Sequence, residues 1–176
     1  MPLVKRNLDA EEVIKMFKGV IEVKCGEKGK IPRRGTGNPA GIDFYMPESV
    51  TLEAFKPEAV DMQVAVDLPE GFCGLVFGRS STRYLSVKMS NVIGLIDNDY
   101  HGKIVVTMEY NPLFHPKGGN TLTLEEGQCY FQMVIVPYFQ VQDMLLVEKF
   151  AEETGRGSLA FGSSDLITTA PKVKED

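Results

Sequence analysis

Residues 60–68 carry the pattern that most constrains how this 176-residue chain can fold. Their sequence, VDMQVAVDL, alternates apolar residues with polar or small ones. The apolar positions are Val60, Met62, Val64, Val66 and Leu68. Successive side chains of a strand point to opposite faces, so the run predicts a half-buried strand whose apolar face lies in the core. The turn sequence PEG, residues 69–71, then ends it.

Two later runs also indicate strands. Residues 103–111, KIVVTMEYN, alternate in the same way. Their apolar face would carry Ile104, Val106, Met108 and Tyr110. Residues 129–139, CYFQMVIVPYF, are apolar on both faces, which is typical of an inner strand. Short strands between turns rich in Gly, Pro, Asn and Asp predict a sandwich, a jelly roll or a small barrel.

Only residues 7–20 have apolar positions at helical spacing, and we expect a helix there. The strand pattern stops after Phe150, and the last residues, APKVKED, are typical of a disordered end. The sequence contains no internal repeat and no sign of a second domain, so it predicts a single domain.

Charge and cysteine usage exclude several classes of function. A formal net charge of −5 argues against a nucleic-acid partner, which needs a basic face. No apolar run approaches the roughly 20 residues of a membrane span, so no membrane partner is expected. Three scattered cysteines, Cys25, Cys73 and Cys129, offer neither a disulfide framework nor a zinc site. They fit a reducing cytosol, and we expect them to be buried packing residues.

Five short polar or glycine-rich segments interrupt the apolar strands. They are AGIDFY (40–45), GRSS (78–81), GLIDNDYHG (94–102), EGQCYFQ (126–132) and RGSLAFGSS (156–164). Taken singly, each can be a turn or a linker. GRSS can also clamp a phosphate through its arginine and hydroxyls. A calcium loop starting at Asp97 fails, because Met108 stands where a bidentate glutamate is required.

Together and in this order, the five segments resemble the five motifs of the trimeric dUTPase family. The matching residues run from Ala40, Gly41 and Asp43 to Arg156, Gly157, Phe161, Gly162 and Ser163. The third motif, GxIDxDYxG, is complete and is the most specific. Departures occur at Ser81 in the second motif and at Leu159, Ala160, Ser164 and Asp165 in and just after the fifth.

This resemblance implies an all-β fold, a distorted jelly roll or barrel-like dUTPase fold with a short N-terminal helix and a mobile C-terminal arm. It implies one dUTPase-like domain over residues 1–176. Residues 1–19 would be a helical extension, and residues 151–176 the arm and tail. The expected assembly is a homotrimer with shared active sites, located in the cytoplasm, or in the host cytoplasm for a viral or phage protein.

The implied reaction is hydrolysis of dUTP to dUMP and pyrophosphate, which supplies dUMP and cleans the nucleotide pool. Asp97 would activate the water that attacks the α-phosphorus. Asp43 would hold Mg²⁺ through water, with the ion bound mainly by the triphosphate. Tyr100 would lie under the deoxyribose, Asn91 and the backbone around Gly94 would read the uracil, and Phe161 would stack on it.

The groups expected to donate to the phosphates are Arg79, Ser80, Gln132, Arg156 and Ser163. Ser81, Ile96 and Gly162 complete the expected substrate-binding set.

Two alternatives remain. A dCTP deaminase, or a bifunctional enzyme, shares the fold and the RSS turn, but it needs a glutamate where Met108 stands. A regulatory binding protein would use the fold to hold a protein partner, with the N-terminal helix and C-terminal tail as candidate interfaces.

Overall fold

The computed structural model describes residues 20–37 and 39–149. The expected helix, apart from Val20, and the expected arm lie outside these described residues. The chain divides into two units, Met1–Gln140 and Val141–Asp176. All regular structure of the described residues belongs to the first unit.

Strands make up nearly all of this regular structure, as the sequence predicts. In chain order the elements are β1 (Glu22–Cys25), β2 (Ile42–Tyr45), β3 (Val50–Glu53), β4 (Glu58–Asp61), β5 (Val64–Asp67), β6 (Phe72–Gly78), α2 (Thr82–Leu85), β7 (Val87–Met89), β8 (Gly94–Ile96), β9 (Val105–Tyr110), the 3-10 turn η1 (Pro112–Phe114), β10 (Thr121–Leu124) and β11 (Cys129–Pro137).

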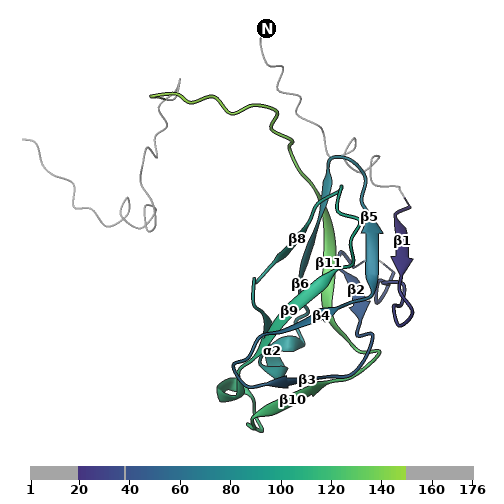
Figure 1. Ribbon diagram of the computed structural model, residues 1–176, viewed down its shortest axis with the longest axis vertical. Coiled ribbons are helices and arrows are strands. Elements are labelled where there is room, and N and C mark those ends of the chain that lie inside the picture. Colours follow the sequence, from purple (N-terminus) through teal and green to yellow (C-terminus); the bar gives the residue numbers. More distant parts are fainter. Residues whose placement is uncertain (1–19, 38, 150–176) are drawn as a thin grey trace, which may run out of the picture. The chain divides into compact units, whose positions relative to one another are not determined.

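The strands pair antiparallel in four groups. The largest sheet has the order β2-β11-β6-β8, and a second has the order β4-β9-β7. Two further pairs are β1-β5 and β10-β3. Figure 1 shows β11 in light green running between β2 and β6, which agrees with its position inside the largest sheet. None of the helices in the described part of the chain is long and apolar enough to cross a membrane.

The core confirms the alternation of β9. Val106, Met108 and Tyr110 are fully buried, and Ile104 just before the strand is 1% exposed. The same core receives Phe44 from β2, and Phe131 and Met133 from β11. The sheets therefore bury one face each around a shared apolar cluster.

The run at residues 60–68 is buried as predicted, but it is not one strand. It breaks at Met62 and Gln63, so that β4 pairs with β9 whereas β5 pairs with β1. Gln63 has a left-handed backbone, with φ of 57°. Its backbone N–H donates to Asp61 Oδ1 at 2.7 Å, which stabilises this turn. Alternation therefore predicted the burial but missed the change of sheet.

Two further expectations need correction. The run of strands ends at Pro137, and residues 138–149 contain no strand. No strand of the described chain pairs with this stretch. The short helix α2 was also not expected, since four residues are too few to show helical periodicity.

Candidate functional site

Asp43, Arg79 and Gln132 lie together at one end of the largest sheet. Asp43 of β2 is the register partner of Gln132 in β11, and directly opposed residues share a face. Arg79 Nε lies 3.2 Å from Asp43 Oδ1. The Asp43 side chain is 13% exposed and that of Arg79 is 38% exposed. The pair is therefore partly buried yet open to a ligand.

The position of Arg79 is fixed by its backbone as well as its side chain. Its N–H donates to the Tyr130 carbonyl at 2.8 Å, and its guanidinium Nη1 donates to the Cys129 carbonyl at 3.0 Å. Thr82, the only buried polar residue in the described core, donates its hydroxyl to the Arg79 carbonyl at 2.7 Å. Sequence reasoning did not find this threonine. The sequence signal for it was the spacing, because a threonine can donate its hydroxyl to the backbone carbonyl three residues earlier.

Ser80 and Ser81 lie in the exposed turn between Arg79 and α2. Ser81 precedes the helix, but its hydroxyl makes no cap hydrogen bond. Both hydroxyls are therefore available to an anion bound beside the Arg79 guanidinium.

Gly41 makes room for the Gln132 side chain. A Cβ at Gly41 would lie 2.2 Å from Gln132 Oε1 and 3.0 Å from its Cδ. The glycine of the first motif thus leaves the space that the glutamine of the fourth motif occupies, and neither segment shows this by itself.

We expect Gly41→Ala to displace the Gln132 amide and to destabilise the fold by about 1–3 kcal/mol, the usual effect of overpacking. Urea denaturation measures this loss. Gly37→Ala is the matched control, because a Cβ there meets nothing within 4 Å. Equal stabilities of the two variants would show that Gln132 moves aside without cost.

A second group of predicted residues lies on the hairpin of β7 and β8 and in the turn that follows. Val92 has a left-handed backbone with φ of 62°, which is uncommon for a β-branched residue. Asn91 is exposed beside it, and Gly94 packs between Met89 and Val76. Such local strain concentrates at functional sites, and this signal is invisible in the sequence.

Asp97 and Tyr100 follow β8 in an exposed turn closed by Tyr100 N–H donating to the Asp97 carbonyl at 3.2 Å. Ile96, just before them, is a core residue. Burial raises the pKa of the Cys73 thiol, and the negative charge of Asp97 raises it further. Among residues 20–37 and 39–149, no basic side chain forms an ion pair with Asp97.

Asp97 of the second group is far from Arg79 within one chain, although Gly94 is opposite Val76, three residues before Arg79. Ile96 of β8 is opposite Gly74 of β6, so Asp97 lies near Cys73, at the far end of β6 from Arg79. Residues 73–79 of a strand extend over roughly 20 Å. The structure therefore does not bring Asp97 and Arg79 together in a single subunit.

Between the two groups, the outer face of the sheet is apolar. It carries Leu75, Phe77, Val134 and Val136, all half-buried, and Leu95, which is 60% exposed. None of them packs against the described core cluster. β11 is thus an inner strand by pairing, as predicted, but within residues 20–37 and 39–149 only one of its faces packs into the core.

The cysteines have no reactive role that the structure supports. All three are free, and only Cys73 is buried, so the expectation of three buried cysteines was wrong for Cys25 and Cys129. Burial raises the pKa of the Cys129 thiol, with a further contribution from Asp43. A thiol with a raised pKa is a weak nucleophile at neutral pH.

The positions that a deaminase would use do not form a carboxylate site. Met108 is fully buried in the core. Glu109 Oε2 lies 3.2 Å from Lys88 Nζ on the neighbouring strand. A hydrogen bond from Ser90 and the Lys88 ammonium lower the pKa of the Glu109 carboxyl. Glu109 is therefore a charged surface partner, and not a general acid held neutral.

The described residues contain no group of three or more His, Cys, Asp or Glu side chains that could hold a metal ion by themselves. Asp43 supplies a single carboxylate next to Arg79. Such a donor set suits a cation that is coordinated mainly by water and by its ligand. The remaining predicted residues, Arg156, Phe161, Gly162 and Ser163, lie outside the described residues.

Residues 27–165 match the family model described as dUTPase. The deoxyuridine 5'-triphosphate nucleotidohydrolase of Escherichia phage T5 is 33% identical over 152 residues, covering 82% of this chain and 98% of that protein. The enzyme of the same name from Alcanivorax borkumensis is 32% identical, covering 82% of this chain and 94% of that protein.

Solved structures of phage enzymes have the same fold. A mutant dUTPase of Staphylococcus bacteriophage 80alpha with dUpNHpp has a TM-score of 0.72 and 26% identity, covering 82% of this chain and 98% of that chain. A mutant dUTPase from phage phi11 of S. aureus, whose structure reveals the coordination of a structural Mg(II) ion, has a TM-score of 0.66 and 26% identity, covering 75% of this chain and 99% of that one.

Proposed function

Because the chain belongs to the dUTPase family, we propose that it is a dUTP diphosphatase that hydrolyses dUTP to dUMP and pyrophosphate. The observation that carries the proposal is the Asp43–Arg79 pair beside Gln132, which offers a carboxylate, a guanidinium and an amide at one open position. A triphosphate needs this combination of hydrogen-bond donors and a cation-binding oxygen.

In this proposal the phosphates bind at the Arg79 end of the sheet. Arg79 donates from its guanidinium, with Ser80, Ser81 and Gln132 as further donors.

By the family resemblance, Arg156 reaches the γ-phosphate, Phe161 stacks on the uracil, and Gly162 and Ser163 close over the phosphates. The whole chain would form one dUTPase-like domain, with residues 1–19 as an extension and residues 151–176 as the arm and tail.

Mg²⁺ is the cofactor that these residues fit. Asp43 is partly buried and is oriented by Arg79, so one of its oxygens can accept hydrogen bonds from the water shell of the ion. When bound, Mg²⁺ neutralises part of the charge of the triphosphate. The cation-binding position would thus be completed by the substrate itself.

Asp97 is the proposed general base. Its carboxylate is exposed and has no cationic partner within the described residues, so it can accept a proton from the attacking water. Attack in line at the α-phosphorus depends on positioning and charge stabilisation, and requires no covalent nucleophile.

The sugar and base would bind along the hairpin and the turn. Tyr100 forms the floor under the deoxyribose. Asn91, Gly94 and the backbone near Ile96 contact the uracil.

We expect Tyr100→Ala to raise the ratio of UTP to dUTP hydrolysis by roughly tenfold or more, because one extra small group in a close-fitting pocket is worth roughly 10–200-fold. Steady-state kcat/KM on both nucleotides measures it. An unchanged ratio would show that Tyr100 has no part in sugar selection.

A homotrimer with shared sites is the proposed assembly. Two observations support it: Asp97 is roughly 20 Å from Arg79 along one chain, and the apolar sheet face between them does not pack against the core cluster of the described residues. Neighbouring copies would cover this face and supply the missing half of each site.

Free cysteines among the described residues support a cytoplasmic location. A regulatory protein partner stays a prediction.

The direct test is pyrophosphate release from dUTP, dCTP, dTTP and UTP in parallel, with and without Mg²⁺. Selective release from dUTP supports the proposal. Ammonia release from dCTP would instead favour a deaminase or a bifunctional enzyme. Absence of turnover with every nucleotide would contradict an enzymatic function.

A further inference from the structure

We propose that Asp61, Gln63 and Lys103 form a clamp that holds the ring of Tyr100 in place and thereby sets the discrimination between deoxyribose and ribose. This inference rests on the proposed function, in which Tyr100 is the floor of the sugar site. The three residues would be positioning residues, since they act through Tyr100.

Two local contacts fix the Tyr100 ring. Its hydroxyl donates to the backbone carbonyl of Lys103 at 2.9 Å. Its ring also folds back over Gly102. A Cβ at Gly102 would lie only 2.6 Å from both the Cζ atom and the hydroxyl oxygen of Tyr100. Tyr100 remains 43% exposed, so that one face of its ring is open to a ligand. Its position therefore depends on where the backbone of residues 102 and 103 lies.

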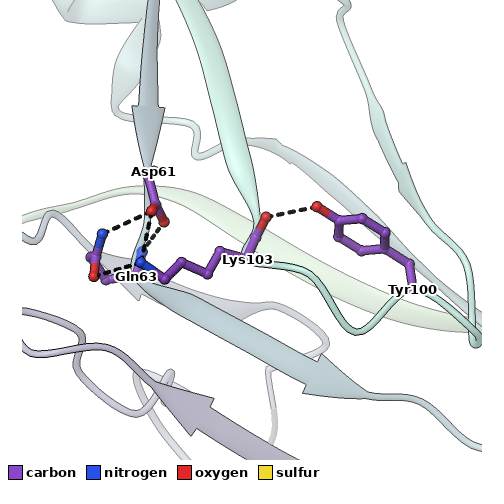
Figure 2. Close-up of polar contacts among 4 residues, drawn as sticks. All are labelled: Asp61, Gln63, Tyr100 and Lys103. Atoms are coloured by element: carbon purple, nitrogen blue, oxygen red, sulfur yellow. Dashed lines mark hydrogen bonds and ion pairs between the residues drawn. The ribbon is translucent and has the colours of Figure 1, made fainter.

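The side chain of Lys103 is held in turn by the break between β4 and β5. Its Nζ donates to Asp61 Oδ2 and to Gln63 Oε1, both at 3.0 Å. Asp61 also accepts from the Gln63 side-chain amide at 2.8 Å. Figure 2 shows the Asp61 and Gln63 side chains at the Nζ end of Lys103, and the Tyr100 hydroxyl at its backbone carbonyl on the other side. The link from clamp to ring passes through a single residue.

Within the clamp, Gln63 is closely packed against the loop after β1, whereas the side chains of Lys103 and Asp61 are 49% and 37% exposed. Gly26 N–H donates to the Gln63 carbonyl at 2.8 Å, and a Cβ at Gly26 would lie 2.2 Å from Gln63 Oε1. A Cβ at Gly29 would lie 2.2 Å from the Gln63 carbonyl oxygen. Two glycines of the loop after β1 thus pack against a residue that already has a left-handed backbone. The residues that bind Lys103 are thus connected to the end of β1, to β4 and to the start of β5.

A small displacement of this ring has a large effect on a selective site. Misplacement by about 1 Å can lower a rate by roughly 100-fold. Ribose differs from deoxyribose by one hydroxyl, and the floor must be close enough to exclude it. A ring freed to move would admit UTP while still accepting dUTP, so the ratio of the two activities is the sensitive quantity.

The test is Lys103→Met, which keeps the side-chain length up to Cε and the backbone carbonyl but removes the Nζ donor. We expect the ratio of kcat/KM for dUTP to that for UTP to fall by roughly three- to tenfold. In a Tyr100→Phe background, which lacks the hydroxyl anchor, the same substitution should leave the ratio unchanged. Asp61→Asn should act in the same direction. Lys56→Met is the matched control, since Lys56 pairs with Glu53 at 3.3 Å, outside the clamp.

A second readout separates the clamp from the proposed function. In protein with ¹³C-labelled tyrosine rings, the Tyr100 signal is assigned by its loss in Tyr100→Phe. It should shift in Lys103→Met and not in Lys56→Met. A shift without any wild-type dUTP hydrolysis would sink the proposed function but keep the clamp on the ring. An unmoved signal, an unchanged ratio, or an equal fall in both backgrounds would overturn the inference and leave a purely structural network.

Discussion

Asp97→Asn is expected to reduce dUTP turnover by about 10²–10⁴-fold, the usual cost of losing a positioned general base. Nucleotide affinity should remain, because the proposed phosphate donors lie with Arg79 at the other end of the sheet. The exposed turn of Asp97 carries no ion pair within the described residues, so the amide should not disturb the fold. Single-turnover kinetics and calorimetric titration with a non-hydrolysable dUTP analogue measure the two quantities.

Asp99→Asn is the matched control, since Asp99 is exposed in the same turn. It should retain most of the activity. If Asp97→Asn hydrolyses dUTP at a near-normal rate while Asp99→Asn does not, the base is Asp99 and the assignment is wrong.

Mixing two inactive variants should restore activity if neighbouring chains share a site. Asp97→Asn lacks the base, and Arg79→Ala lacks the main phosphate donor. Unfolded and refolded together, the chains should form mixed trimers of the proposed kind, in which some sites combine an intact Asp97 from one subunit with an intact Arg79 from another. If equal amounts of the two chains mix at random, about a quarter of the heterologous sites contain both intact residues. Activity should therefore recover to about a quarter of the wild-type rate.

The control for this experiment is the double variant, Asp97→Asn with Arg79→Ala, mixed with either single variant. No combination then supplies both residues, and no recovery is expected. Differently tagged subunits, purified through both tags, establish that mixed trimers have formed. Failure to recover activity in such trimers would contradict shared sites and require Asp97 and Arg79 to approach within one chain.

The sequence predicted what depends on spacing along the chain. The alternation of residues 103–111 gave the buried face of β9 correctly, because side chains of a strand alternate whatever the strand pairs with. The order of five motifs led to the family, which the comparisons confirm. Both are local patterns, and each can be read without knowledge of the tertiary structure.

What the sequence could not predict depends on contacts between distant residues. The change of sheet at Gln63 follows from its left-handed backbone and its bonds to Asp61 and Lys103. The need for glycine at position 41 follows from Gln132, about ninety residues later. The separation of Asp97 from Arg79 follows from strand register, which motif order does not contain.

The placement of Asp97 and Arg79 at opposite ends of β6 has a consequence for how the enzyme responds to its own abundance. A lone subunit would hold no complete site, so the fraction of active enzyme would obey mass action among subunits. Specific activity would then fall on dilution, although every chain remains folded. A substitution at Leu95 on the apolar sheet face could silence catalysis without touching a reacting group, by weakening subunit affinity. Such a defect would disappear at high protein concentration, whereas loss of the Asp97 carboxylate would not.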